Sequence, residues 1–119
     1  MAKPRTTVEP YVWLMFSGGG VIAALTFPVL LFLLGVAIPL GWVSPPDHGH
    51  LLAVLSHPLT RLGLVVMCAM ALVHAAHRLR FTLQDGLQLH KYHALLATVA
   101  YGGALAGAIA AGYVMFVVL

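Results

Sequence analysis

The chain has 119 residues, of which 61% are hydrophobic and only 8% are charged, and its formal net charge is +3. Soluble domains carry about 25% charged residues, so this composition excludes a water-covered globular domain and indicates an integral membrane protein that forms one unit. The positive charge is spread thinly, which excludes a nucleic-acid-binding patch, and the single cysteine, Cys68, excludes an intrachain disulfide or a cysteine metal site.

Three long apolar runs follow one another along the chain after a polar start. Residues 1–10 predict a cytoplasmic arm, and residues 11–119 predict a three-helix membrane anchor. A helix needs about 20 apolar residues to cross a bilayer, and each of the three runs is long enough, at about 12–40, 59–77 and 92–118. Because a spanning segment must satisfy its own backbone hydrogen bonds, the expected fold is an all-α integral membrane protein with three transmembrane helices.

The segments between the apolar runs differ in character. Residues 41–58 contain a Ser-Pro-Pro-Asp turn and three histidines, and they predict a loop with a short interfacial helix at 51–55. Residues 79–91 are amphiphilic and connect the second run to the third. Within the runs, small residues predict helices that approach one another closely. The glycines concerned are Gly18, Gly19, Gly20, Gly102, Gly103, Gly107 and Gly112.

The basic residues predict the orientation of the helices in the membrane. Five of them lie on one side of the predicted bundle, and only Arg61 lies on the other. The five are Lys3, Arg5, Arg78, Arg80 and Lys91. Because lysine and arginine are enriched in cytoplasmic segments, we expect a cytoplasmic N-terminus and an external C-terminus. Trp13 then lies at the cytoplasmic face, together with the polar segment at residues 74–80.

That polar segment, with the sequence HAAHRLR, stands at the end of the second apolar run. His77 and Arg78 within it, together with Trp13, are candidates for quinone binding. A quinone needs hydrogen-bond donors at its carbonyl oxygens, which Arg and Trp supply, and a group that exchanges protons near neutral pH, which His supplies. The alternative is an interfacial role, with Trp13 as an aromatic anchor and the arginines as snorkelling cations.

His74 raises the possibility of haem b, because one histidine of this segment can serve as a single axial ligand. His77 lies three residues further along the same helix face, so it cannot supply the opposite ligand. That ligand would come from another subunit or from another span, where His93 is a geometric candidate. The loop histidines have no metal-binding spacing, and no nucleophile motif or nucleotide-binding fingerprint occurs. We therefore expect neither a metal site nor catalytic residues in this chain.

An ordered set of motifs extends over nearly the whole chain. The pattern E-P-x-x-W-x-x-F-x-x-G-G occupies residues 9–20, and Ile38-Pro39-Leu40-Gly41 ends the first apolar run. Arg61 opens the second run, and His77-Arg78 closes it, with Asp85 beyond. In this order, in its length and in its three spans, the chain resembles the D subunit of fumarate reductase, the small membrane anchor of the menaquinol:fumarate reductase complex.

The resemblance implies a set of partners. In that family a flavoprotein subunit with covalent FAD reduces fumarate, an iron–sulfur subunit passes electrons to it, and the C subunit is a second three-span anchor. The two anchors attach the soluble subunits to the bacterial cytoplasmic (inner) membrane and form a menaquinol site between subunits. The residues matching Trp13, His77 and Arg78 lie at that site. This chain would then be a non-catalytic subunit that binds no cofactor by itself and serves electron transport in anaerobic respiration.

Two other functions stay open. His74 departs from the haem-free pattern of the family and is similar to the histidine of haem b-binding anchors of succinate dehydrogenase. A small structural or transport membrane protein without a redox role is the other alternative. The residues leave the physiological direction of the reaction and the type of quinone undecided.

Overall fold

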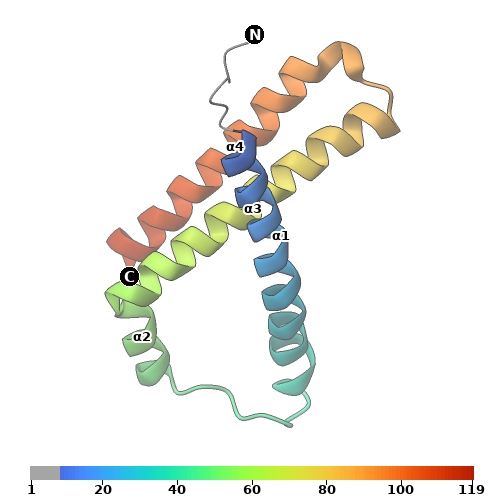
Figure 1. The fold of residues 1–119 in the computed structure, drawn as a ribbon. Helices are drawn as coiled ribbons and strands as arrows, with labels where there is room; N and C mark the ends of the chain where they lie inside the picture. Colours follow the sequence, from blue (N-terminus) through green and yellow to red (C-terminus); the bar gives the residue numbers. More distant parts are fainter. Residues whose placement is uncertain (1–8) are drawn as a thin grey trace.

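The computed structural model describes residues 9–119, and this part of the chain consists of helices joined by short connections. The α-helices are α1 (Glu9–Phe32), α2 (His48–Ser56), α3 (Pro58–Gly86) and α4 (His93–Tyr113), as Figure 1 shows. Residues 1–8, which make up most of the expected cytoplasmic arm and include Lys3 and Arg5, lie outside the described part.

Wider helical turns extend α1 and α4, and a tighter turn joins α3 to α4. A π-helical turn, Leu33–Ala37, continues α1, and a second one, Val114–Val118, continues α4. A 3-10 turn, His90–Tyr92, leads from α3 into α4. Because these turns keep the backbone hydrogen-bonded along the segment, they add to the length that each helix can place in a bilayer.

Three helical segments are long and apolar enough to cross a membrane, namely Pro10–Ala37, Pro58–Gly86 and His90–Val118. They confirm the expected all-α membrane protein with three transmembrane helices. Large apolar side chains on all three segments are exposed in the chain by itself, and within the described part the buried apolar residues are three alanines, Ala37, Ala76 and Ala104. Such extensive apolar exposure is unfavourable in water, so lipid or other membrane subunits must cover these surfaces.

Local capping interactions explain where α2 and α3 begin. The Asp47 carboxylate accepts a hydrogen bond from the backbone N–H of His50 at 3.2 Å and so caps α2. The imidazole Nδ1 of His57 accepts from the N–H of Leu59 at 3.2 Å, and Pro58 occupies the first position of α3, where its missing N–H costs nothing. The short helix expected at residues 51–55 is confirmed, and it is longer than expected at both ends.

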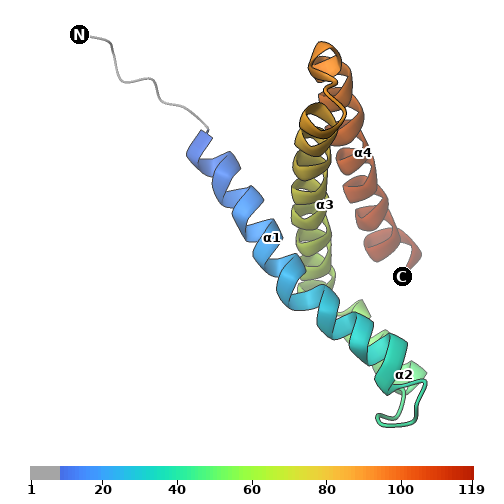
Figure 2. The same cartoon turned by 90° about the vertical axis from the view of Figure 1, so that its right-hand side faces the viewer.

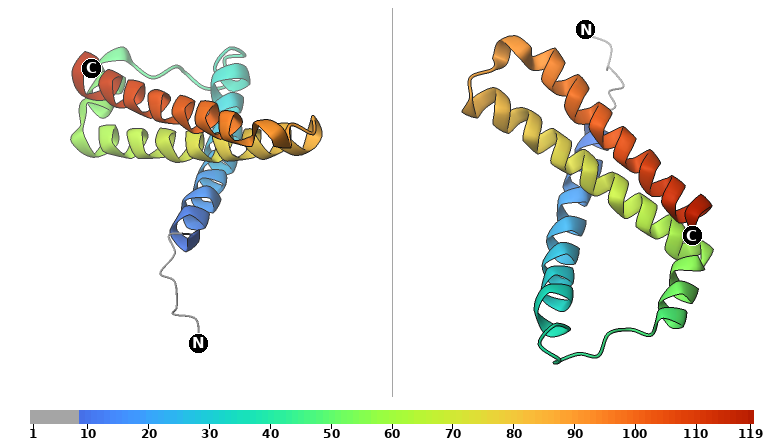
Figure 3. Two further views of the ribbon diagram at one scale, coloured as in Figure 1. Left: turned by 90° about the horizontal axis from the view of Figure 1, so that it is seen from above. Right: turned by 180° about the vertical axis from the view of Figure 1, so that it is seen from behind.

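The three long helices are arranged as a hairpin and a crossing helix. α3 and α4 run antiparallel side by side, and α1 crosses α3 obliquely (Figures 1 and 2). The first described turn of α1 and the α3–α4 turn lie toward one end of the molecule. The α1–α2 loop, α2 and the C-terminus lie toward the other end (Figure 3).

Glycines set the distance between α1 and α3 at the crossing. A Cβ atom on Gly19 would collide with the backbone carbonyl of Met70, and one on Gly20 would lie 2.6 Å from the imidazole Cε1 of His74. Close approach is also found at Gly107, where a Cβ would lie 2.9 Å from a methyl carbon of Leu72. The expectation of close packing is therefore confirmed at these glycines, as small residues at helix interfaces allow.

Other glycines of the third span do not serve this purpose within the chain. A Cβ atom on Gly102, Gly103 or Gly112 would meet no atom of the described residues within 4 Å. For these three positions the expectation of close helix contact is wrong as far as this chain is concerned, because they lie on faces of α4 that are turned away from α1 and α3.

Candidate functional site

Aromatic and imidazole rings from all three long helices meet near the point where α1 crosses α3. Residues three, four or seven positions apart share one face of a helix, which explains how α1 and α3 each present several rings to the same place. We call this group the crossing cluster, and it comprises Trp13, Phe16, His74, His77, Phe81 and Tyr101.

His77 occupies the centre of the crossing cluster. Its Nδ1 lies 2.8 Å from the hydroxyl oxygen of Tyr101, which joins α3 to α4 through a hydrogen bond between two side chains. Ring centroids lie 4.5 Å away for Phe16, 4.8 Å for Phe81 and 6.4 Å for Trp13. The structure therefore places two of the three expected quinone residues, Trp13 and His77, in one cluster.

Trp13 lies at the open edge of the cluster. Its indole is 61% exposed and meets the Phe16 ring edge-on at a centroid distance of 5.7 Å. Among residues 10–119 no group accepts a hydrogen bond from the indole N–H, which can donate to a ligand or to a lipid headgroup. Its position suits both interpretations drawn from the sequence.

His74 is held inside the crossing rather than pointing into open space. A carbonyl oxygen can only accept, so the Nδ1–H of His74 donates to the backbone carbonyl of Phe16 at 2.9 Å. The Phe16 ring stacks on the imidazole at a centroid distance of 4.5 Å and an interplanar angle of 16°. The ring also faces Gly20, which has no side chain to displace it. His74 therefore links α3 to α1 through a hydrogen bond and a ring stack.

The two arginines of the polar segment have different surroundings. Arg78 is exposed, and it forms no ion pair with any residue from 10 to 119. Arg80 is half-buried, and its guanidinium carbon lies 4.9 Å from the centroid of Phe81 and 5.9 Å from that of Tyr101. Arg80 is therefore more than a cation that follows the charge rule, because its side chain covers one side of the crossing cluster.

Sequence reasoning assigned no role at the site to three members of this region. Phe16 was noted only as part of the motif at residues 9–20, and Tyr101 and Gln84 were not noted at all. Gln84 is only 8% exposed, and its Oε1 has no hydrogen-bond partner among the described residues; nor has the buried Nε of Arg80. The available signal was the spacing of residues 77, 80, 81 and 84, which places all four on one face of α3.

The proposed second haem ligand does not approach His74. His93 begins α4, and its Nδ1 lies 3.2 Å from the carbonyl oxygen of His90. In the antiparallel hairpin, His77 lies beside Tyr101. His93 is eight residues from Tyr101 toward the α3–α4 turn, whereas His74 is three residues from His77 away from that turn. At a rise of about 1.5 Å per residue, His93 and His74 are therefore about 16 Å apart along the hairpin. His93 is therefore not placed to supply the axial ligand opposite His74.

Within residues 10–119 no group of three or more histidine, cysteine or acidic side chains is arranged to hold a metal ion. His90 and Asp85 approach within 3.9 Å at the exposed end of the hairpin and form an ion pair only when the histidine is protonated. This contact is solvent-exposed and contributes little to stability.

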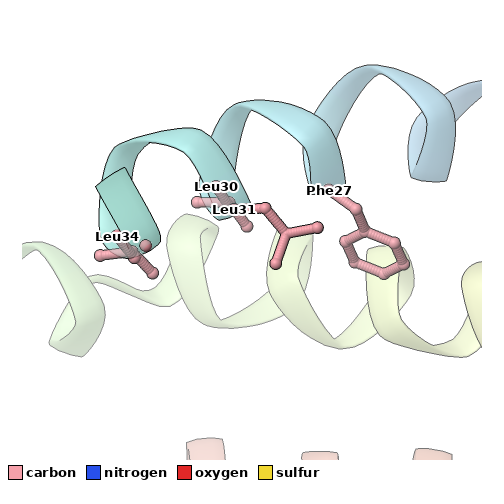
Figure 4. Close-up of a pocket in the computed structure, with 5 residues that line it drawn as sticks. Phe27, Leu30, Leu31 and Leu34 are labelled. Carbon is pink, nitrogen blue, oxygen red and sulfur yellow. The ribbon is translucent and has the colours of Figure 1, made fainter. Parts of the chain in front are cut away.

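Apolar grooves in the described part of the chain lie away from the crossing cluster. One of about 540 Å³ runs along α1 and is lined by Phe27, Leu30, Leu31, Leu34 and Gly35 (Figure 4). Another of about 400 Å³ lies among α1, α3 and α4 around Cys68 and Gly107. Both are lined almost wholly by apolar atoms, so neither offers the polar groups that a quinone headgroup requires. Trp13 and His77 instead face an open surface.

Comparison with known proteins identifies relatives that match most of the chain. The sequence model of the family described as the fumarate reductase D subunit matches residues 3–117. The fumarate reductase D subunit of Mycobacterium tuberculosis is 50% identical over 111 residues, which cover 93% of this chain and 89% of that protein. The protein of the same name from Mannheimia succiniciproducens is 34% identical over 117 residues, covering 98% and 91% of the two chains. That of Haemophilus ducreyi is 41% identical over 90 residues, covering 73% of each.

Proposed function

Because the chain belongs to the family of fumarate reductase D subunits, which are membrane anchors, we propose that it attaches a flavoprotein and an iron–sulfur subunit to the bacterial cytoplasmic membrane. In this proposal it pairs with a second anchor, the C subunit, and takes no part in fumarate chemistry itself. The family relation also argues against the small structural or transport protein without a redox role. FAD and the iron–sulfur clusters belong to the soluble partners.

The second part of the proposal is that this chain forms one wall of a menaquinol site at Trp13, His77 and Arg78. The observation that carries it is the meeting of Trp13 and His77, 64 sequence positions apart on α1 and α3, at an exposed edge with a centroid distance of 6.4 Å. The adjacent Arg78 is exposed and has no ion-pair partner among residues 10–119. An exposed surface with hydrogen-bond donors on Trp13 and Arg78 suits a site to which another subunit adds the remaining residues.

Each of the three side chains has a distinct task at such a site. Menaquinol supplies two electrons to the iron–sulfur subunit and releases two protons. The Trp13 indole N–H and the Arg78 guanidinium are donors that hold a quinone oxygen in place, and Arg78 also stabilises negative charge that develops on it. The His77 imidazole accepts a proton from the quinol. Phe16 and Phe81 exclude water from one side of the imidazole.

The substitution Arg78→Leu tests this site in the intact complex. We expect menaquinol-dependent fumarate reduction in membranes to fall by about tenfold or more, because a charged hydrogen bond to the quinone oxygen is lost. Activity with an artificial dye that delivers electrons directly to the soluble subunits should stay unchanged. Lys91→Leu is the matched control, since it removes an exposed cation from the same end of the hairpin. Unchanged menaquinol turnover in Arg78→Leu would refute the site.

A haem b-binding anchor of the succinate dehydrogenase type is the second candidate function, and His74 is the residue on which it depends. Its Nδ1–H bond to a carbonyl oxygen is an arrangement that haem ligands share, but the contacts with Phe16 and Gly20 favour a packing role. We expect the absorbance spectrum of the intact complex to lack a Soret band. A Soret band that disappears in His74→Ala would instead establish haem ligation by this chain.

A further inference from the structure

We propose that Tyr101 is a positioning residue for menaquinol oxidation, which acts by fixing the orientation and the tautomer of His77. The inference rests on the proposed role of His77 at the menaquinol site and adds a residue from α4 to it. Tyr101 itself need not touch the quinone. Its hydroxyl lies on the side of the imidazole that faces α4, and its effect reaches the substrate through His77.

The first support is the hydrogen bond between the Tyr101 hydroxyl and Nδ1 of His77, at 2.8 Å. Among the side-chain hydrogen bonds of the described residues, it is the one that joins two side chains. It connects α3 with α4 across 24 sequence positions. An imidazole bonded in this way cannot rotate about its side-chain torsions without losing the bond, so the direction of its second nitrogen is fixed as well.

The second support is the state of that other nitrogen. No residue from 10 to 119 forms a hydrogen bond with Nε2 of His77. The side chain as a whole is half-buried, but the Nε2 atom itself is not buried. Nε2 is therefore accessible at the surface of the cluster. Because Nδ1 and Nε2 lie on different edges of the imidazole, the bond to Tyr101 leaves Nε2 directed away from α4.

A hydroxyl can serve His77 in both of the states that a proton acceptor passes through. While His77 is neutral, its Nδ1–H donates to the Tyr101 oxygen and the lone pair on Nε2 is free to receive a proton from a quinol hydroxyl. After protonation, Nδ1–H still donates to the same oxygen, so the imidazolium keeps its partner. A phenylalanine at this position offers no acceptor, and the ring would be free to adopt the tautomer that carries its hydrogen on Nε2.

Neighbouring side chains restrict the position of the Tyr101 ring. The side chain is half-buried, and the guanidinium of Arg80 lies 5.9 Å from the centroid of its ring and 4.9 Å from that of Phe81. A cation over an aromatic face is attractive, so Arg80 restricts the movement of the tyrosine ring. Because Arg80 contacts the ring while the hydroxyl bonds to His77, the two interactions do not compete.

The test is Tyr101→Phe in the complete complex in native membranes, assayed with a short-chain menaquinol analogue. General acid–base groups contribute about 10²–10⁴-fold to a rate, and loss of their alignment forfeits part of this, so we expect kcat to fall by about tenfold with little change in KM. Dye-linked fumarate reduction measures assembly and should stay at the wild-type level. Tyr113→Phe is the matched control, an exposed tyrosine on the same helix.

The double variant separates positioning from packing. In a His77→Ala background, Tyr101→Phe should cause no further loss, because its effect passes through the imidazole. Independent, multiplying losses would overturn the inference, as would a Tyr101→Phe complex that loses dye-linked activity from the membrane. Normal turnover in Tyr101→Phe together with impaired turnover in His77→Ala would overturn the inference alone. Wild-type turnover in His77→Ala would refute the proposed menaquinol role itself.

Discussion

Gly19 allows α1 to approach α3 closely because it has no side chain. A Cβ there would overlap the backbone carbonyl of Met70, and a carbonyl cannot move aside as a flexible side chain can. The hydrogen bond from His74 to Phe16 lies one turn away on the same two helices. The position of α1, and with it the position of Trp13 relative to His77, therefore depends on this one glycine.

We predict that Gly19→Ala destabilises the anchor by about 1–3 kcal/mol, the usual range when extra volume is forced into a closely packed contact. Heating the membranes and measuring the fraction of fumarate reductase activity that stays membrane-bound would show release at a lower temperature. Gly102→Ala is the control, since a Cβ at Gly102 meets no atom of the described residues within 4 Å. Equal losses in the two variants would contradict a specific role for the crossing.

At the scale of the helices, the three spans were predictable because the bilayer leaves few choices. A continuous apolar run of sufficient length must satisfy its own backbone hydrogen bonds, so composition and length together specify a helix. The residue at which α3 ends was harder to predict from composition and length. Hydropathy ends the second run at about residue 77, but the helix continues to Gly86 because Leu79, Arg80 and Gln84 are good helix formers. Polar residues end a membrane span without ending a helix.

The candidate site was predictable only in part, for a related reason. Trp13, His77 and Arg78 were recognisable from their chemistry and from the family pattern of motifs. Tyr101 contributes through its partner, and the pairing of residue 77 with residue 101 depends on the register of the α3–α4 hairpin. That register follows from the turn at residues 87–92, whose geometry the hydrophobic pattern does not specify.

The length of α3 indicates how the helix lies in the bilayer. Its 29 residues extend about 43 Å at a rise of about 1.5 Å per residue, which exceeds the hydrocarbon thickness of about 30 Å. If the apolar run from Leu59 occupies the hydrocarbon, the turns after His77 reach the headgroup region and beyond. This depth suits a site that exchanges protons with water and passes electrons to a soluble partner.

The molecule as a whole has two ends with different charge. The end that contains the α3–α4 turn carries Arg78, Arg80 and Lys91, whereas Arg61 stands at the opposite end with its Nε donating to the carbonyl of Leu55 at 3.4 Å. The two further basic residues of the chain, at positions 3 and 5, precede α1. These charges favour an orientation with the α3–α4 turn in the cytoplasm, where the proposed iron–sulfur subunit can reach the crossing cluster.

Cysteine labelling tests that orientation with the whole complex in intact cells. In a Cys68→Ala background, we predict that a membrane-impermeant maleimide labels Ser44→Cys, in the α1–α2 loop, without lysis. Leu87→Cys, in the exposed turn after α3, should react only after lysis, and Val66→Cys, near the middle of the apolar run at residues 59–77, should stay protected in both cases. Dye-linked activity in each variant confirms assembly. The reverse pattern, with Leu87→Cys labelled in intact cells, would place the crossing cluster on the wrong side of the membrane for electron transfer to a cytoplasmic partner and would refute the proposed menaquinol site along with the orientation.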